Sequence, residues 1–447
     1  MKRLRTFFAV MATIVLVCSA CALTACSNNN DNTTDSRLSA LHAEDGKILN
    51  SEGVEIALRG TNLGGWLVQE DWMCPTDQTD YLSTIKTLYS RFGAEKAEEL
   101  IDVYEDNWIS DADFSNIAAL GLNVVRIPFT YMNLYKTLDD NGNPLSPADY
   151  TLRADAFERL DYAIEQCAKN KLYVILDLHG AAGSQNAKDH SGDTSDVKLF
   201  DDDEYGELCR VNTVNLWTEV AKRYKSNTTV AAFDLLNEPE GRTGSTGDVQ
   251  FILYDRIYEA IRAEDPTRMI IMESVWEPLN LPSPEDYDWE NVVYEYHHYN
   301  WTDSNTSNSS FYTMKQLGEA IANRGVPVLI GEFNAWGDAG RTTGKADQTD
   351  EQAYSGVLEF YTGKGWHWTT WTYKVHLTSG NWGLYLLNAS AETAKVNPSA
   401  DTEEEIRTKW AACRTDTSYT VNMSHADTVS EFAKAEFGVA PPQYSIL

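Results

Sequence analysis

Eight short runs of apolar and β-branched residues recur between residues 56 and 371, and amphipathic stretches separate them. The runs lie at 56–60, 123–129, 173–178, 230–236, 269–275, 292–296, 326–330 and 366–371. Continuous apolar runs of this length are typical of strands that are covered on both faces, as in a parallel sheet. Eight strand–helix units in about 400 residues is the number found in one (β/α)8 barrel, so we predict the α/β class and a single TIM barrel.

Between the runs, apolar residues recur every three or four positions, which is the pattern of a helix with one buried face. We expect helices at 82–108, 111–120, 154–171, 403–413 and 429–437. The first of them is an addition to the first barrel unit, and the last two pack around the barrel. We find no internal repeat of solenoid spacing and no second domain.

A basic and then apolar segment opens the chain. Lys2, Arg3 and Arg5 precede an apolar run at 7–23, which leads into the sequence Leu-Thr-Ala-Cys that ends at Cys26. This order is typical of a secretory signal. The ending resembles the lipobox of bacterial lipoproteins, in which the cysteine becomes the lipidated first residue. An ordinary secretory signal and a short transmembrane anchor are the alternatives.

These features divide the chain into three expected parts. We expect a lipoprotein signal peptide at 1–25, a flexible tether rich in Asn, Asp and Thr at 26–43, and one folded domain at 44–447. Later apolar runs are all shorter than the about 18 residues that a membrane span needs. We therefore expect an extracytoplasmic, cell-surface protein that the lipid on Cys26 alone anchors to the bacterial membrane.

The charge balance and the cysteines exclude several kinds of partner. With 36 Lys and Arg against 67 Asp and Glu, the formal net charge is −31. Such a chain repels polyphosphate, so nucleic acid is not an expected partner. The cysteines beyond the signal are Cys74, Cys167, Cys209 and Cys413, and they form no CxxC pair or Cys/His cluster. We therefore expect no structural zinc site.

Polar, ionisable or aromatic residues follow almost every apolar run. In a barrel of this kind the active site lies where the strands end, so these residues are the candidates for function. They are Asn62 to Trp66 with Glu70 and Asp71, Arg126, His179, Asn237 and Glu238, Trp276, His297 and Tyr299, Glu332, and Trp371. Arg126 also fits a buried ion-pair partner of a core carboxylate, and Trp66, Trp276, Trp368 and Tyr373 fit either core residues or sugar platforms.

Two of the candidates are glutamates that follow the fourth and seventh runs, Glu238 and Glu332. Glycoside hydrolysis needs such a pair, one carboxylic acid to protonate the leaving oxygen and one carboxylate to attack or to activate water. Arg126 would favour the ionised form of a nearby glutamate, whereas a less charge-compensated glutamate keeps its proton. Gly331, before Glu332, would let a ligand approach the backbone closely.

One detail of the fourth run limits its local geometry. Asn237 and Glu238 are adjacent, and adjacent residues of an ideal strand point to opposite faces. Both side chains can reach one pocket only if the strand has ended or bulged before them.

Taken in order, the strand-end residues resemble those of glycoside hydrolase family 5, a cellulase-type family. That family carries Arg after strand two, His after three, Asn-Glu-Pro after four, His-x-Tyr after six, Glu after seven and Trp after eight. The matching residues are Arg126, His179, Asn237-Glu238-Pro239, His297-His298-Tyr299, Glu332 and Trp371. The resemblance spans roughly residues 47–388.

The resemblance implies a retaining O-glycosyl hydrolase with Glu238 as acid/base and Glu332 as nucleophile. It further implies that Asn237 binds the substrate 2-hydroxyl and that Trp371 forms the floor of the subsite for the cleaved sugar. His297 and Tyr299 would orient substrate and nucleophile. The adjacent His298 is expected to pack on the other face.

A finer resemblance is to the exo-β-1,3-glucanase and β-glucosidase branch, carried by residues 59–70 and 179–186. In that branch the residue matching Glu70 holds hydroxyls of the non-reducing-end glucose. The chain departs from the branch at three positions: Lys188 and Thr302 replace aromatic residues of the acceptor clamp, and His190 replaces Asn.

We therefore predict a monomeric retaining β-glycosidase with a carbohydrate substrate, such as β-glucan, an oligosaccharide or a β-glucoside, and exo action. An endo-acting glucanase, mannanase or glycosylceramidase on the same barrel is the alternative, and a non-catalytic sugar-binding lipoprotein is the rival from another class. His297 and His298 lack a third ligand at useful spacing, so we expect neither a metal nor a cofactor.

Overall fold

The computed structural model describes residues 37–241, 248–274, 281–299, 324–336, 349–391 and 393–438 of the chain. Within these residues, eight parallel strands close into a barrel in the order β10-β11-β12-β3-β4-β7-β8-β9. Their bounds are β3 Arg59–Asn62, β4 Val124–Thr130, β7 Tyr173–Gly180, β8 Val230–Asp234, β9 Met269–Glu273, β10 Val292–Tyr299, β11 Val328–Asn334 and β12 His367–Thr370. Each strand overlaps one of the eight predicted runs, so the predicted (β/α)8 barrel is confirmed.

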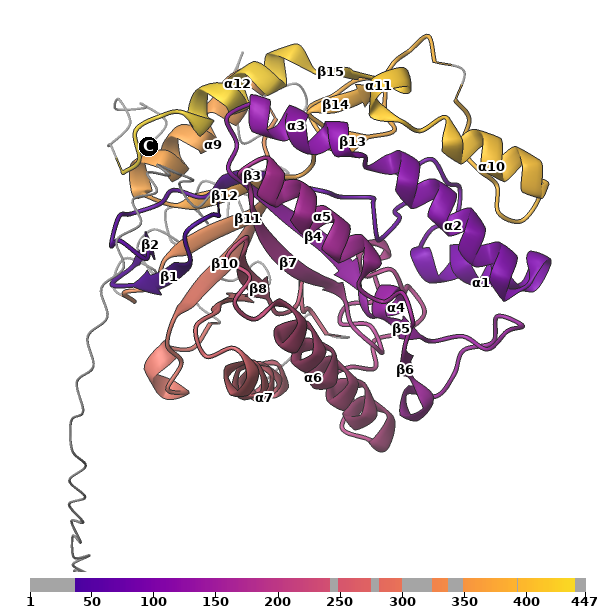
Figure 1. Cartoon of the computed structure of the whole chain (residues 1–447), viewed down its shortest axis with the longest axis horizontal. Helices are drawn as coiled ribbons and strands as arrows, with labels where there is room; N and C mark the ends of the chain where they lie inside the picture. Colours follow the sequence, from indigo (N-terminus) through magenta and orange to yellow (C-terminus); the bar gives the residue numbers. More distant parts are fainter. Residues whose placement is uncertain are drawn as a thin grey trace, which may run out of the picture. The chain divides into compact units, whose positions relative to one another are not determined.

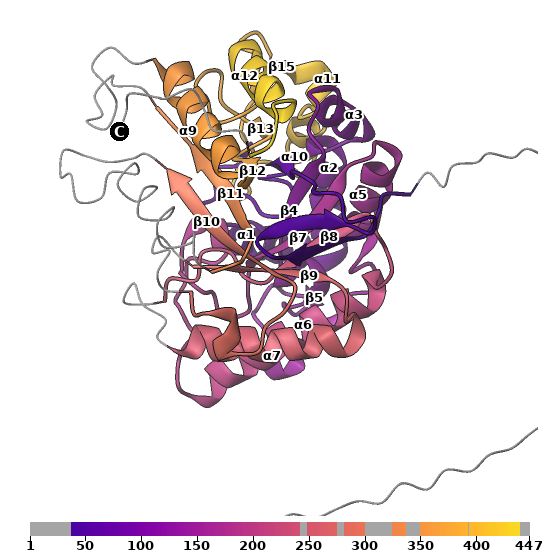
Figure 2. The same ribbon diagram turned by 90° about the vertical axis from the view of Figure 1, so that its left-hand side faces the viewer.

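Helices surround the barrel strands in both views (Figures 1 and 2). The longer ones are α1 Tyr81–Phe92, α2 Ala94–Trp108, α3 Asp111–Ala119, α5 Glu158–Lys169, α6 Glu204–Tyr224, α7 Asp248–Glu264, α9 Asp350–Lys364, α10 Glu403–Ala411 and α12 Met423–Ala433. Short helical segments are α4 Tyr131–Leu134, α11 Thr415–Ser418, η1 Pro147–Asp149, η2 Asp189–Ser191 and η4 Pro284–Asp286. Among the described helices none combines the length and the apolar character that crossing a membrane requires.

Two predicted helices differ most from the structure, and the helix predicted at 154–171 is shortened to α5 at Glu158–Lys169. The segment predicted at 82–108 is divided into α1 and α2 by Gly93, whose φ of +79° ends the first helix. The last helix, predicted at 429–437, is α12 at Met423–Ala433. It begins earlier because Ala426 and Val429 are buried on its inner side, where α12 packs against α9.

A hairpin of β1 Leu41–Glu44 and β2 Lys47–Asn50 precedes the barrel. Leu41 and Ile48 are buried with residues from the first halves of the barrel strands, including Val124 and Val293. The hairpin therefore covers the end of the barrel where the strands begin. The predicted boundary between tether and domain at residue 44 is wrong, because Leu41 already belongs to this core. The predicted signal peptide, Cys26 and residues 26–36 of the tether lie outside the described residues.

In the part of the chain that the structure describes, three pairs or groups of short strands lie outside the barrel. Besides β1 and β2, they are β5 Tyr135–Lys136 with β6 Thr151–Leu152, and β13 Lys374–Val375 with β14 Tyr385–Leu387 and β15 Tyr419–Val421. The last group follows directly on β12 and joins the C-terminal helices to the rim of the barrel. The segment after residue 371 contacts the ends of two barrel strands, since the N–H of Tyr373 donates to the carbonyl of Asn62 and the side chain of Asn334 donates to the carbonyl of Asn381.

Candidate active site

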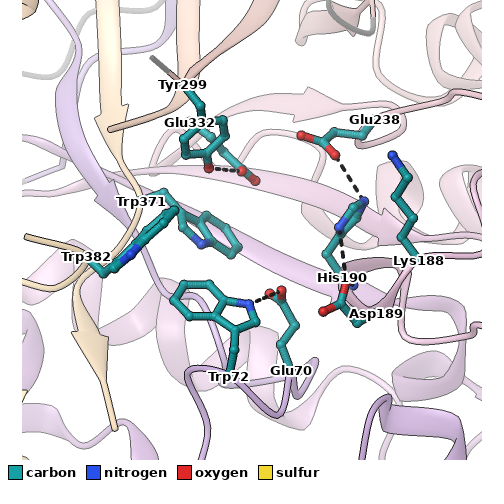
Figure 3. Close-up of a pocket in the computed structure, with 10 residues that line it drawn as sticks. All are labelled: Glu70, Trp72, Lys188, Asp189, His190, Glu238, Tyr299, Glu332, Trp371 and Trp382. Carbon is teal, nitrogen blue, oxygen red and sulfur yellow. Dashed lines mark hydrogen bonds and ion pairs between the residues drawn. The ribbon is translucent and has the colours of Figure 1, made fainter. Parts of the chain in front are cut away.

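A cavity of about 490 Å³ lies where the barrel strands end. Ten residues line it: Glu70, Trp72, Lys188, Asp189, His190, Glu238, Tyr299, Glu332, Trp371 and Trp382. Figure 3 shows the three tryptophan rings on one side and Lys188, Asp189 and His190 on the other. Of the predicted site residues, Glu70, Glu238, Tyr299, Glu332 and Trp371 line this cavity, and Arg126, His179, Asn237 and His297 lie buried behind its wall.

Glu332 lies on β11 and accepts two hydrogen bonds from strong donors. The Nη1 of Arg126 donates to its Oε1 at 3.2 Å. The hydroxyl of Tyr299 donates to its Oε2 at 2.7 Å, as Figure 3 shows. Its side chain is only 6% exposed. The arrangement fixes an oxygen of Glu332 at the cavity wall, as the expected nucleophile requires.

Arg126, on β4, lies fully buried among carboxylates. Its nitrogens are 3.0 Å from Asp177, 2.9 Å from Asp234, 3.3 Å from Glu295 and 3.2 Å from Glu332. Burial alone would lower the pKa of the guanidinium, but these negative charges raise it well above its usual range. Arg126 is therefore both a core ion-pair partner and a hydrogen-bond donor to Glu332. The two interpretations of its position in the sequence, as a core residue and as a site residue, are both correct.

The chain leaves the barrel before Glu238, as the adjacency with Asn237 requires. Strand β8 ends at Asp234, and Glu238 has a φ of +42°. Its backbone N–H donates to the carboxylate of Glu273 at 2.6 Å, and the side chain of Gln185 donates to the carbonyl of Asn237 at 2.8 Å. These two bonds hold an uncommon backbone conformation that turns the Glu238 side chain into the cavity.

Glu238 contacts two histidines. Nε2 of His190 is 3.0 Å from its Oε2, and Nδ1 of His297 is 2.7 Å from its Oε1. Burial alone would raise the pKa of Glu238, but the two imidazoles outweigh burial and hold its pKa well below the usual range. Conversely, burial would lower the histidine pKa values, yet the surrounding carboxylates raise both. The expectation that the acid/base glutamate is the less charge-compensated one is therefore wrong.

The two glutamates of the cavity are close together. Nδ1 of His297 lies 2.7 Å from Oε1 of Glu238 and 3.5 Å from Oε2 of Glu332. The two oxygens can be no further apart than the sum of these distances. That limit on these two oxygens is compatible with the about 5–5.5 Å carboxyl separation of retaining glycosidases.

Trp371 presents a flat ring next to Glu332. It stacks on His179 with ring centroids 5.3 Å apart and planes 3° apart. Nδ1 of His179 lies 2.6 Å from Asp177, and burial lowers the pKa of His179 to about 3, so the stacked imidazole is neutral. The ring of Trp371 is thus held rigidly, as the floor of a sugar subsite would need.

Glu70 lies in the loop after β3, between Trp72 and Asp189 (Figure 3). Trp72 donates its indole N–H to Glu70 at 2.7 Å, and the rings of Trp72 and Trp382 are 4.8 Å apart (Figure 3). Burial raises the pKa of Glu70 to about 8. Glu70, Trp72 and Trp382 together close one side of the cavity.

Sequence reasoning missed several residues of the cavity. Trp72 follows Glu70 by two residues, and this spacing within one loop was the available signal. Asp189 lies in η2, between the two positions where the chain departs from the family branch. Trp382 lies in the loop between β13 and β14, and no sequence pattern marks it. Thr302 lies outside the described residues.

Other aromatic candidates belong to the core. Trp66 donates to the carbonyl of Glu105, Trp368 is fully buried, and Tyr373 donates to Asp113 on α3. Strand alternation would place Tyr373 on the side of Trp371, but β12 ends at Thr370, so the alternation does not continue. His298 contacts the hydroxyl of Tyr361, which confirms its packing role. Trp276 lies outside the described residues.

Two groups of three side chains in the described residues have ligand-type atoms within 4.8 Å of one another. They are Glu70, Asp189 and His190, and Glu238, Glu273 and His297. In each group the histidine is also an ion-pair partner of Glu238. Attraction between opposite charges is therefore sufficient to explain the short separations.

Comparison with known proteins adds an independent line of evidence. A family model described as cellulase (glycosyl hydrolase family 5) matches residues 89–376. A β-xylosidase of Phanerodontia chrysosporium is 30% identical over 348 residues, which cover 73% of this chain and 69% of that protein. A probable glucan 1,3-beta-glucosidase A of Aspergillus fumigatus is 27% identical over 398 residues, which cover 79% of this chain and 90% of that protein.

Solved structures share the fold. An endogalactoceramidase superposes with a TM-score of 0.57 at 17% identity, covering 88% of this chain and 85% of that one. A β-glucanase of Saccharophagus degradans superposes with a TM-score of 0.50 at 16% identity, covering 87% of this chain and 97% of that one. At these identities the likeness supports the barrel fold alone.

Proposed function

Since the chain belongs to glycosyl hydrolase family 5, and is thus a retaining O-glycosyl hydrolase, we propose that it removes glucose units from the non-reducing ends of β-glucans or β-glucosides. The observation that carries the proposal is the pair Glu238 and Glu332, which contact one histidine nitrogen while Arg126 and Tyr299 hold Glu332.

In the first step, an oxygen of Glu332 attacks the anomeric carbon of the sugar. The bond from that carbon to the leaving oxygen breaks, and this oxygen takes the proton that Glu238 donates. The product is a glycosyl ester on Glu332 and a free aglycone. Arg126 and Tyr299 fix the attacking carboxylate, which lowers the entropic part of the barrier.

In the second step, a water molecule attacks the same carbon from the side that the aglycone has left. Glu238 takes a proton from this water, and the ester bond to Glu332 breaks. The released sugar has the configuration of the substrate, and both glutamates return to their starting states.

Exo action is supported by the closed side of the cavity. Glu70 can accept hydrogen bonds from sugar hydroxyls there, and Trp72 and Trp382 add ring surface beside it. The relatives with 27% identity carry the name glucan 1,3-beta-glucosidase, which also favours removal of glucose from chain ends.

Variants of the two glutamates test the hydrolytic function. Glu332→Gln is expected to lower kcat by about 10³-fold or more, because an amide cannot form the glycosyl ester. Glu238→Ala lacks the acid/base carboxylate. With an activated aryl glucoside, added azide is expected to restore turnover of this variant and to give the β-glycosyl azide. Full activity of Glu332→Gln, or an α-glycosyl azide, would contradict the proposal.

Product analysis tests the mode of cleavage. Laminarin, cellooligosaccharides and aryl β-glucosides are digested, and products are sampled at early times. Glucose alone is the expected early product. A ladder of mixed oligosaccharides would instead assign endo action on the same barrel.

We also propose that the chain is a monomeric cell-surface lipoprotein attached to the bacterial membrane through Cys26. The lipobox-like ending at 23–26 and the Asn-rich segment that follows support this proposal. Labelling with radioactive palmitate in a bacterial host is expected for the full chain and not for Cys26→Ser. Light scattering of the chain without residues 1–26 is expected to give the mass of one copy.

A further inference from the structure

Glu238 must deliver a proton, yet the structure surrounds its carboxylate with two histidines. If Glu238 were the resting holder of the proton, contacts with two cations would remove it. The question of where the proton resides deepens the proposed function and rests on it, because the proton matters only if Glu238 acts on a leaving group.

His190 is placed to exchange this proton with Glu238. It lies in η2, its Nε2 is 3.0 Å from Oε2 of Glu238, and its ring lines the cavity (Figure 3). Its side chain is 18% exposed. It therefore contacts both the carboxylate and the space that water and substrate enter.

Asn186 stabilises the form of His190 in which Nε2 has given up its proton. The amide oxygen of Asn186 accepts from the backbone N–H of Lys188 at 2.9 Å, which fixes the amide nitrogen on the opposite side. That nitrogen donates to the carbonyl of Glu238 and lies 2.8 Å from Nε2. When Nε2 has given up its proton, the second amide hydrogen can donate to it, whereas a protonated Nε2 meets another N–H donor there. The contact therefore favours release of the proton toward Glu238.

His297 does not have these properties. Its side chain is 1% exposed, and it lies 2.7–3.7 Å from the carboxylates of Glu238, Glu273, Glu295 and Glu332. Four carboxylates hold its positive charge, and burial separates it from solvent. It therefore remains a fixed cation while Glu238 changes its protonation state.

We propose that His190 is the resting holder of the proton that Glu238 delivers, and thus a positioning residue for that proton. At rest, Nε2–H of His190 donates to the Glu238 carboxylate. The proton moves to Oε2 and then to the leaving oxygen, which leaves His190 neutral and Glu238 ionised. In the second step the proton taken from water passes through Glu238 back to Nε2. Each turnover thus transfers one proton to the leaving oxygen and recovers one from water.

Several charged groups face His190 and determine its titration. Burial opposes the imidazolium, whereas Glu238, Asp189 and Glu70 favour it, and the nearby His179 is neutral. Lys188 lies two residues before His190 and pairs with Glu240. The carboxylates prevail, and the pKa of His190 lies well above its usual range. The pair thus keeps its proton to higher pH than a lone histidine would.

The pH dependence of kcat/KM on an aryl β-glucoside with a poor leaving group tests the proposal. In the wild type the basic limb reports loss of the proton from the His190–Glu238 pair, so it is expected above the ordinary histidine pKa of about 6.5. In His190→Asn the proton leaves a carboxylic acid instead of an ion pair. The basic limb is then expected to move toward acid by about one pH unit or more.

The leaving group separates this role from a structural one. On the basic limb, His190→Asn is expected to lower kcat/KM for the poor leaving group about 10-fold for each pH unit that the limb moves. For 2,4-dinitrophenyl β-glucoside, which needs no proton, the change is expected to be about twofold or less. A structural defect would lower both equally. His42→Asn, on β1 at the opposite end of the barrel, is the matched control and should keep the wild-type profile.

Each outcome decides the proposal. An unchanged basic limb in folded His190→Asn, or equal losses for both leaving groups, overturns it. A wild-type limb below 6.5 overturns it even if His190→Asn does not fold. Failure of the wild type to hydrolyse any β-glucoside would instead overturn the proposed function, so the two failures are distinguishable.

Discussion

Each glutamate of the cavity has its own set of hydrogen-bond donors, and the donors match the two tasks. Glu332 is held by a guanidinium and a phenol, neither of which can receive a proton from it at neutral pH. Glu238 is held by two imidazoles, of which one is open to the cavity. At the scale of single residues, the partner decides whether a carboxylate remains a nucleophile or exchanges a proton.

Glu70 is expected to make the protein less stable as the pH rises. Burial raises its pKa to about 8 in the folded state, above the usual value of 4.5, so the folded state binds more protons between these values. The free energy of unfolding therefore falls across this range. Glu70→Gln should unfold at the wild-type temperature near pH 4.5 and be more stable by about 1–3 kcal/mol at pH 8.5, while kcat/KM falls.

Thermal unfolding at both pH values measures this effect. Val54→Ala, at an exposed position without a titratable group, is the control, and its difference from the wild type should not depend on pH. An equal stability change for Glu70→Gln at pH 4.5 and 8.5 would rule out the stated cause.

Arg126 is expected to be a large contributor to stability as well as a ligand of Glu332. Its removal leaves Asp177, Asp234 and Glu295 buried without their cation. Arg126→Leu should lower the free energy of unfolding by about 3–5 kcal/mol in urea titrations. Arg414→Leu, which breaks an exposed pair with Asp416, should change it by less than about 1 kcal/mol. Similar losses in the two variants would show that the buried cluster does not depend on Arg126.

At the scale of elements, the contact between β10 and β11 explains Gly331. A Cβ at this position would lie 1.4 Å from Oε1 of Glu295 on β10. The expectation that Gly331 makes room for a ligand is therefore wrong, because the space belongs to a buried carboxylate of the neighbouring strand. That carboxylate lies 3.3 Å from Arg126 and 3.5 Å from His297, so the glycine indirectly positions both.

Gly331→Ala is expected to lower both stability and activity. The added methyl group must displace Glu295, at a cost of about 1–3 kcal/mol for an overpacked core, and kcat/KM should fall as Arg126 shifts. Gly356→Ala on α9, where no atom lies within 4 Å of the new Cβ, should instead stabilise the protein by up to about 1 kcal/mol. Urea denaturation and kinetics compare the variants, and wild-type behaviour of Gly331→Ala would refute the argument.

At the scale of the whole molecule, the four cysteines of the described chain are free and buried. Burial raises the pKa values of Cys74, Cys209 and Cys413 to about 12, and that of Cys167 also rises. A buried thiol with a raised pKa forms little thiolate and reacts slowly. The fold therefore depends on packing rather than on disulfide bonds at these positions.

Alkylation with iodoacetamide is expected to spare these four cysteines in the folded protein and to modify all of them in 6 M guanidinium chloride, since unfolding exposes the thiols. Peptide mass spectrometry locates the modified positions. The unfolding temperature should not change with a reductant. Rapid native labelling of any of the four would contradict their burial.

The barrel could be predicted from the sequence because its signals are local. A strand buried on both faces must be apolar throughout, so each of the eight strands appears as a short apolar run. The carboxyl ends of parallel strands meet at one end of a barrel, so the polar residues after those runs had to be neighbours. Arg126, Glu238 and Glu332 were found in this way.

Only the tertiary structure decided which side chains touch. The carboxylate partners of Arg126 come from four other strands, Trp382 comes from a loop without a pattern, and the contact of His190 with Glu238 joins two separate loops. Such contacts arise when the barrel closes and brings distant parts of the chain within about 4 Å, where charges and hydrogen bonds act. The sequence thus determined the strands and the kinds of group at their ends, while barrel closure determined the charge and proton state of each group.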